Sequence, residues 1–157
     1  IFRGSYPYPN EKDYKFLREQ NINTIINLEY LASGNTKLRN KYNMTMFRYP
    51  TFILPWFDHR FDFTSIKAAF KKVIEEKKNG NNIYIHCIHG SDRTSILAAA
   101  LTIRENLCFK ENVDTQNLAE TIKLDLQKYN FHTSVFPTLY TQLPTWTTNP
   151  PEWICEE

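Results

Sequence analysis

The sequence has little net charge, few glycines and no long apolar run. Its 19 basic and 17 acidic side chains leave a formal net charge of +2, which gives no support for binding to nucleic acid or to an anionic membrane. The longest apolar run, residues 95–103, is far too short to span a bilayer, so we expect no transmembrane segment. The 4 glycines form no Gly-rich loop that would cradle a nucleotide.

Signals of several other enzyme classes are missing as well. The sequence has no Ser, His and Asp order of a hydrolase triad and no spacing typical of zinc ligands, so we expect no metal and no cofactor. Repeats, linkers and low-complexity segments are absent, and 157 residues suffice for one domain, residues 1–157, with a hydrophobic core. The chain begins with Ile1 rather than Met, and we expect any signal peptide or membrane anchor to lie before it.

Predicted strands alternate with predicted helices along the chain. We predict strands at residues 24–28, 44–49 and 83–85, and an edge strand followed by a turn within residues 1–9. Helices are predicted at residues 11–20, 64–78, 95–103 and 115–129, with a last helix that has Pro137 near its first turn. This alternation predicts an α/β fold with a mainly parallel central sheet flanked by helices. The tail, residues 144–157, is expected to be either a packed extended segment or loosely held.

The most informative stretch is residues 86–94, His-Cys-Ile-His-Gly-Ser-Asp-Arg-Thr. Cys87 ends the predicted strand and Arg93 opens the predicted buried helix, so the loop between them leads into a helix N-terminus. Loop amides and a helix N-terminus that point at one spot bind an anion. The same positive field favours the thiolate form of Cys87, whose sulfur faces that spot. A thiolate that faces a bound oxyanion is arranged for nucleophilic attack on phosphorus.

A Cys-x5-Arg-Thr pattern preceded by His resembles the signature of cysteine-dependent tyrosine and dual-specificity phosphatases. The opening, residues 2–28, is similar to the start of bacterial dual-specificity phosphatases, where an Arg-Ser/Gly-x-x-Pro turn leads into a helix and then into a strand that ends in Asn-Leu. The resemblance implies that Thr94 helps the thiolate to depart when the phosphoenzyme is hydrolysed. The family usually has Gly where this chain has Ser95, and we expect this difference to affect how closely the helix packs.

The chemistry assigns a role to each part of the signature loop. Cys87 is the predicted nucleophile, and the planar fork of the Arg93 guanidinium matches two phosphate oxygens. Thr94 or Ser91 is predicted to donate a hydroxyl hydrogen bond to the sulfur, and His86 to orient the cysteine backbone. The predicted phosphate-binding residues are Ile88, His89, Gly90, Ser91, Asp92 and Arg93. The predicted reaction is hydrolysis of phosphate monoesters, on phosphotyrosine and also on phosphoserine or phosphothreonine of proteins, through a cysteinyl-phosphate intermediate.

The leaving oxygen needs a proton from a general acid on another loop. In the family this acid is an Asp on a loop that follows a strand well before the cysteine, and residues 51–63 fit that place. We favour Asp58, which lies in the middle of the loop and is expected to be free to swing. Asp62, two residues before the predicted helix, is the alternative, although its position suits a helix cap better. A site that uses His59, or no fixed acid, remains open.

The loop also bears on the substrate. Phosphatases that act on inositol phosphates tend to carry lysines there, whereas this loop has none and Asp92 adds a negative charge, which is compatible with phosphotyrosine. Nearby aromatic residues form either the wall of a pocket for a ring or part of the core: Tyr49, Phe52, Trp56 and Phe57. The predicted partner is a phosphorylated protein or a small phosphate ester. The alternatives are a phosphatase for phosphoinositides or other small phosphate esters, and an inactive phosphate-binding module.

The 3 cysteines leave one further question open. If Cys87 stays a thiolate, Cys108 and Cys155 either pair with each other or remain two partly buried thiols, and we favour the unpaired thiols. The similarity to periplasmic bacterial enzymes suggests export, to the periplasm or out of the cell, as a hypothesis for localisation. A secreted effector phosphatase directed at a host is one form of that hypothesis.

Overall fold

The computed structural model describes residues 1–7, 10–31, 34–55 and 58–157. One sheet has the strand order β1-β4-β2-β3, and all its pairings are parallel. The strands are β1 (Phe2–Gly4), β2 (Thr24–Asn27), β3 (Thr45–Arg48) and β4 (Ile83–His86). The predicted α/β class with a mainly parallel sheet is confirmed, and β1 lies at an edge as expected.

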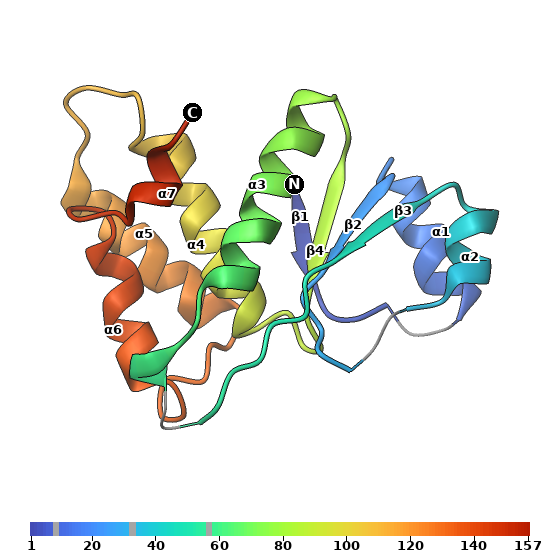
Figure 1. Cartoon of the computed structure of the whole chain (residues 1–157), viewed down its shortest axis with the longest axis horizontal. Helices are drawn as coiled ribbons and strands as arrows, with labels where there is room; N and C mark the ends of the chain where they lie inside the picture. Colours follow the sequence, from blue (N-terminus) through green and yellow to red (C-terminus); the bar gives the residue numbers. More distant parts are fainter. Residues whose placement is uncertain (8–9, 32–33, 56–57) are drawn as a thin grey trace.

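Helices cover both faces of the sheet (Figure 1). Within the described residues they are α1 (Glu11–Glu19), α2 (Thr36–Lys41), α3 (Thr64–Lys78), α4 (Arg93–Asn106), α5 (Thr115–Lys128), α6 (Pro137–Thr145) and α7 (Glu152–Cys155). A short 3-10 turn, η1 (Asp58–Arg60), lies before α3. Figure 1 shows α1 and α2 on one side of the sheet and α3 to α7 on the other.

The central strands are buried on both faces, which explains their continuous apolar sequences. Ile25 of β2 lies in a cluster with Tyr14 and Leu17 of α1. Ile26, the next residue, lies in the larger cluster that contains Phe70 of α3 and much of α4. Successive side chains of a strand point to opposite faces, so two neighbouring isoleucines fill two separate clusters.

α4 accounts for the longest apolar run of the sequence. Its residues Ile96, Leu97, Ala100 and Ile103 are fully buried, because the helix packs against α3, α5 and α7 as well as the sheet. The helix begins at Arg93, the residue predicted to open it, and runs to Asn106, past the predicted apolar run. None of the helices in the described parts of the chain is long and apolar enough to cross a membrane.

The prediction that Cys108 and Cys155 stay unpaired is wrong, because the fold brings them together. Cys108 follows the end of α4, Cys155 ends α7, and their sulfurs form a disulfide. The tail is therefore packed: Ile154 is fully buried, and Arg104 donates to the carbonyls of Ile154 and Glu156 at 2.7 Å each. Cys87 is the free cysteine of the chain.

Candidate active site

The signature loop lies at the carboxyl end of the sheet, between β4 and α4. Gly4 of β1 and Asn27 of β2 both pair with His86 of β4, so three chain segments leave the sheet at one level. In α/β sheets ligands bind at the carboxyl ends of the strands. The segments that follow β1, β2 and β4 therefore meet at the candidate site, and the Cys-x5-Arg pattern covers one of these three.

Cys87 follows β4 directly and is only 3% exposed. The Thr94 hydroxyl, from the first turn of α4, donates to its sulfur at 3.1 Å, so Thr94 rather than Ser91 makes the predicted hydroxyl contact. The buried His86 ring donates from Nδ1 to the Cys87 carbonyl at 2.9 Å. Burial lowers the pKa of His86 to about 4, so the ring is neutral at neutral pH and holds the start of the loop without adding charge.

The carbonyl groups of the loop are bonded by β1 and the turn that follows it. The Tyr6 N–H donates to the Ile88 carbonyl at 2.8 Å, and Arg3 Nη2 donates to the Gly90 carbonyl at 2.7 Å. In the described ranges, none of the backbone N–H groups from Ile88 to Arg93 donates to a protein acceptor. A loop with bonded carbonyls and unbonded amides next to a helix N-terminus can bind an anion through those amides.

Gly90 lets the loop rest directly on β1, and Gly4 leaves room for the Tyr84 side chain. Gly90 has a φ of +72°, and a Cβ atom there would lie 2.4 Å from the Gly4 carbonyl oxygen. A Cβ atom on Gly4 would in turn lie 2.4 Å from the Tyr84 hydroxyl oxygen. Glycine is therefore needed at position 90 both for the left-handed backbone conformation and for the close approach of the two segments.

Arg93 opens α4, and two acceptors orient its guanidinium. Nη2 donates to the Glu29 carboxylate at 3.0 Å, and Nη1 donates to the Thr51 carbonyl at 3.2 Å. Glu29 lies just after β2 and is 2% exposed, so the ion pair is shielded from water. These bonds use one N–H of each terminal nitrogen, and the remaining N–H groups are available to phosphate oxygens.

Asp92, which the sequence predicts to add a negative charge to the loop, bonds to His132 in the structure. Its carboxylate accepts a hydrogen bond from the His132 N–H at 2.8 Å, and the ring Nδ1 of His132 lies 2.7 Å from its other oxygen. His132 lies between α5 and α6, so this pair ties the loop to the C-terminal part of the chain. His89 is exposed on the loop. In the described residues, Cys87 and its flanking histidines form no group of three metal ligands.

Asp58 is not the free carboxylate that the sequence predicts. It lies in η1, is 3% exposed, and its Oδ2 accepts a hydrogen bond from the Leu139 N–H at 2.9 Å. Leu139 is in the first turn of α6, where backbone N–H groups have no partner within the helix. Asp58 therefore anchors the start of α6, and a free swing of its side chain would break this bond.

Asp62 bonds to Thr64, the first residue of α3, although the N-cap position of this helix is Phe63 rather than Asp62. Its Oδ1 accepts hydrogen bonds from the Thr64 hydroxyl at 2.6 Å and from the Thr64 N–H at 2.9 Å. These two bonds, the hydroxyl bond first, lower the pKa of Asp62 from its usual value. An exposed carboxylate that is held ionised is poorly suited to deliver a proton to a leaving group at neutral pH.

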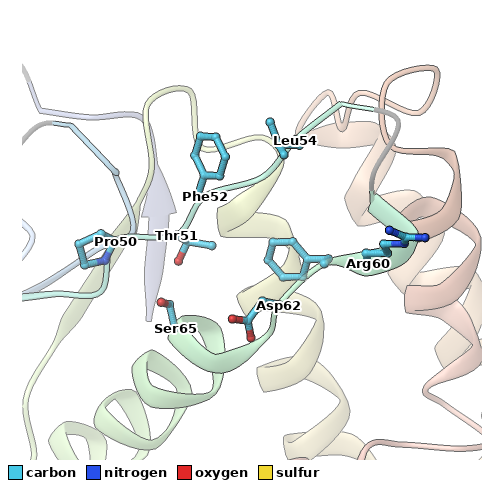
Figure 2. Close-up of a pocket in the computed structure, with 8 residues that line it drawn as sticks. Pro50, Thr51, Phe52, Leu54, Arg60, Asp62 and Ser65 are labelled. Atoms are coloured by element: carbon cyan, nitrogen blue, oxygen red, sulfur yellow. The ribbon is translucent and has the colours of Figure 1, made fainter.

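A cavity of about 430 Å³ lies beside the site, between the segment after β3 and the start of α3 (Figure 2). Its wall includes Thr51, whose carbonyl accepts the Arg93 hydrogen bond, and Phe52, which is 59% exposed. Tyr49, by contrast, packs against the core. Trp56 and Phe57, the other two aromatic residues expected to line a ring pocket, lie outside the described residues.

Two residues of the site, Arg3 and Glu29, were not predicted as functional. Arg3 is part of the Arg-Gly-Ser opening that resembles bacterial phosphatases, a resemblance that assigns it no role. Glu29 lies two residues after the end of β2. The rule that ligands bind at the carboxyl ends of parallel strands would have pointed to Glu29 from the sequence.

The fold and a match to a family model place the chain among the phosphatases of the dual-specificity and tyrosine type. The model, described as "Polymorphic toxin system, DSP-PTPase phosphatase", matches residues 4–106, which include the whole signature loop. The chain belongs to this family. No curated protein matches the chain.

Solved structures of phosphatases share the fold at low sequence identity. The core catalytic domain of the PP-IP phosphatase Siw14 from S. cerevisiae is 14% identical, with a TM-score of 0.64 over 96% of this chain and 80% of that one. P. aeruginosa TpbA in complex with phosphotyrosine is 15% identical, with a TM-score of 0.55 over 94% and 86%. The kinase-associated phosphatase KAP is 16% identical, with a TM-score of 0.60 over 89% and 76%.

Proposed function

We propose that the chain hydrolyses phosphate monoesters, foremost phosphotyrosine in proteins, through a cysteinyl-phosphate intermediate. The observation that carries the proposal is the meeting of three groups at one end of the sheet: the Cys87 sulfur, the Thr94 hydroxyl and the oriented Arg93 guanidinium. All three groups lie at the ends of the signature loop. In the described residues, the backbone N–H groups between them have no protein acceptor. This arrangement supports an oxyanion bound next to a nucleophile.

The reaction has two steps. In the first, the Cys87 thiolate attacks phosphorus, the sulfur–phosphorus bond forms, and the bond to the tyrosine oxygen breaks. The amides of residues 88–93 and the Arg93 guanidinium bind the non-bridging oxygens while their charge is redistributed. In the second step, water attacks phosphorus, the sulfur–phosphorus bond breaks, and the Thr94 hydroxyl stabilises the departing thiolate. Neither step calls for a metal or a cofactor.

We propose Asp58 as the acid that protonates the leaving oxygen. The choice over Asp62 is supported by the two Thr64 bonds, which hold Asp62 in its ionised form. The Oδ1 atom of Asp58 accepts no hydrogen bond from the residues that the structure describes, so it is available to carry a proton. For this role the Asp58 carboxylate, 3% exposed here, must open toward the bound ester.

Phosphotyrosine is favoured by the surroundings of the loop. The loop carries no lysine that would bind further phosphate groups, and the exposed Phe52 ring follows Thr51, whose carbonyl accepts the Arg93 hydrogen bond. TpbA, which shares the fold, binds phosphotyrosine in its structure. The second candidate is a small phosphate ester, such as an inositol phosphate, because the similar Siw14 is a PP-IP phosphatase.

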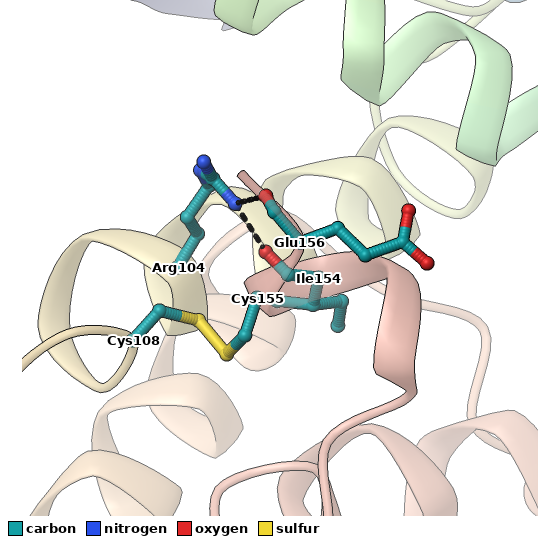
Figure 3. Close-up of a disulfide and its surroundings, with 5 residues drawn as sticks. All are labelled: Arg104, Cys108, Ile154, Cys155 and Glu156. Carbon is teal, nitrogen blue, oxygen red and sulfur yellow. Dashed lines mark hydrogen bonds between the residues drawn. A yellow bond between two sulfur atoms is a disulfide. The ribbon is translucent and has the colours of Figure 1, made fainter.

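We further propose that the protein acts outside the cytoplasm, as an effector phosphatase. The Cys108–Cys155 disulfide supports this, since disulfides persist in oxidising compartments and are rare in the cytosol (Figure 3). Figure 3 shows the disulfide beside the bonds of Arg104 to the last residues of the chain. The family description, which names a polymorphic toxin system, agrees with export.

A substrate panel tests the proposed function. The purified chain is assayed on a phosphotyrosine peptide, a phosphoserine/phosphothreonine peptide, an inositol phosphate and a chromogenic aryl phosphate, with Cys87→Ser as the control. Highest kcat/KM on the phosphotyrosine peptide and no turnover by Cys87→Ser are expected. Preference for the inositol phosphate would favour the second candidate. Phosphate-ester binding without turnover by the wild-type chain would show an inactive binding module instead.

A further inference from the structure

We propose that Arg3 is a positioning residue of the phosphate-binding loop, which it holds from behind through the Gly90 carbonyl and the Ser95 hydroxyl. This inference rests on the proposed function and deepens it. Arg3 lies on β1, 87 residues before Gly90 of the signature loop, and belongs to no part of the Cys-x5-Arg pattern.

The contacts of Arg3 join the loop to two helices. Nη2 donates to the Gly90 carbonyl at 2.7 Å and to the Ser95 hydroxyl at 2.6 Å. Nη1 donates to the Asp125 carboxylate of α5 at 3.0 Å, and the guanidinium lies over the Tyr129 ring, 3.7 Å from its centroid. A side chain held by an ion pair and a ring at one end and by two acceptors at the other has one position, so it fixes both acceptors.

The hydrogen bond from Arg3 to the Gly90 carbonyl bears on anion binding because it fixes the orientation of the Gly90 peptide. Gly90 is buried and has a φ of +72°, and glycine can rotate its peptide more freely than other residues. Without Arg3, the carbonyl would be left without its donor in a buried place, which is costly. A rotated peptide would bring a carbonyl oxygen, rather than an amide, toward the phosphate. The Arg3 bond therefore favours the loop conformation in which the amides are available.

Arg3 also acts through its charge. Its side chain is 10% exposed, and burial lowers the pKa of the guanidinium from its usual value, whereas the charges of Asp125, Tyr129 and Cys87 favour the charged form. The attraction between the charges of Arg3 and Cys87 is mutual, so we expect the loss of Arg3 to change the reactivity of the sulfur.

Alkylation of Cys87 by iodoacetamide measures this effect without any turnover. Cys108 and Cys155 form the disulfide, so under non-reducing conditions Cys87 is the one thiol that reacts. The nearby Tyr84 has a pKa raised by burial to about 12, and His86 has a pKa lowered by burial to about 4. Neither titrates near neutral pH. The other titratable or charged groups at the loop are His89, Asp92 with its partner His132, and Arg93 with its partner Glu29, and they are the same in every variant compared.

The test compares Arg3→Met with Arg104→Met. Arg104 is a matched control, because it is also a partly buried arginine with two bonds to backbone carbonyls, but it lies near the opposite end of α4 from the loop. In Arg3→Met we expect the alkylation midpoint to rise by roughly one pH unit and kcat/KM on a phosphotyrosine peptide to fall by about tenfold or more. In Arg104→Met we expect a lower melting temperature, with the midpoint unchanged.

Arg3→Lys is the second variant to measure, and it tests the proposal even if Arg3→Met does not fold. Lys retains the charge but cannot hold Gly90 and Ser95 with a planar fork, so the midpoint should stay closer to wild type while KM rises. A folded Arg3→Met whose midpoint and kcat/KM match those of Arg104→Met would overturn the inference, as would Arg3→Lys with wild-type KM. If the wild-type chain turns over no substrate while Arg3→Met still shifts the midpoint, the proposed function fails and the role of Arg3 in positioning the loop stands.

Discussion

Opening the Cys108–Cys155 disulfide is expected to cost the chain much of its stability. The bridge joins residues 47 apart, and for a loop of that length the chain-entropy relation gives about 4 kcal/mol. In a chain of 157 residues, 1 kcal/mol corresponds to roughly 3 °C, so the melting temperature should fall by about 12 °C on reduction. Ile154 and the Arg104 bonds lie beside the bridge, so α7 should separate from α4 first.

The measurement is thermal unfolding followed by circular dichroism, with and without a phosphine reductant. The Cys108→Ser/Cys155→Ser double variant should melt where the reduced wild type does and should not respond to reductant. Cys87→Ser is the matched control: it keeps the bridge and should lose as much stability on reduction as the wild type. A fall of less than about 3 °C in the wild type would refute the reasoning, since the bridge would then contribute under roughly 1 kcal/mol.

Three further predictions concern the site. Asp58→Asn should lower kcat on a phosphotyrosine peptide by about 10²–10⁴-fold and change little on a nitrophenyl phosphate, whose leaving group needs no proton. Asp62→Asn should change kcat on the two substrates equally, and the reverse pattern would exchange the roles of the two residues. Glu29→Gln should lower kcat/KM by about 10- to 100-fold, because Arg93 loses its charged partner, and unchanged kinetics would rule out that orienting role. His86 has a pKa of about 4 in the folded protein and near 6.5 in the unfolded chain, so about 3 kcal/mol of stability should be lost as the pH falls from 6.5 to 4. The denaturant midpoint of His86→Gln should depend less on pH in this range than that of the wild type.

The parts of the fold that depend on residues close together in the sequence could be predicted from the sequence. β4, the signature loop and α4 form one contiguous stretch, in which an apolar run, a Cys-x5-Arg pattern and a second apolar run follow each other. Strand and helix periods depend on side chains a few positions apart, so they are visible without the tertiary structure. The parallel sheet follows from the alternation of strands and helices, because parallel strands need a crossover between them.

The contacts that complete the site could not be predicted in this way, because each joins residues far apart in the chain. Asp58 and Leu139 are 81 residues apart, and a position in the middle of a loop does not reveal that a helix N-terminus will cover it. The pair of Glu29 and Arg93 spans 64 residues. The disulfide likewise depends on where α7 packs. The number of cysteines alone did not decide whether Cys108 and Cys155 form a disulfide or stay free thiols.

Ser95 shows how such a distant contact changes the meaning of a local difference from the family. Where Gly is usual, a serine side chain in the first turn of α4 was expected to affect the packing of the helix. Ser95 is 1% exposed, and its hydroxyl accepts a hydrogen bond from Arg3 Nη2, the same nitrogen that donates to the Gly90 carbonyl. The hydroxyl is therefore satisfied inside the packed helix, and one guanidinium links Gly90 of the loop to the first turn of α4. A residue that departs from the signature thus strengthens the contact between the loop and β1, because the sheet order places β1 next to β4.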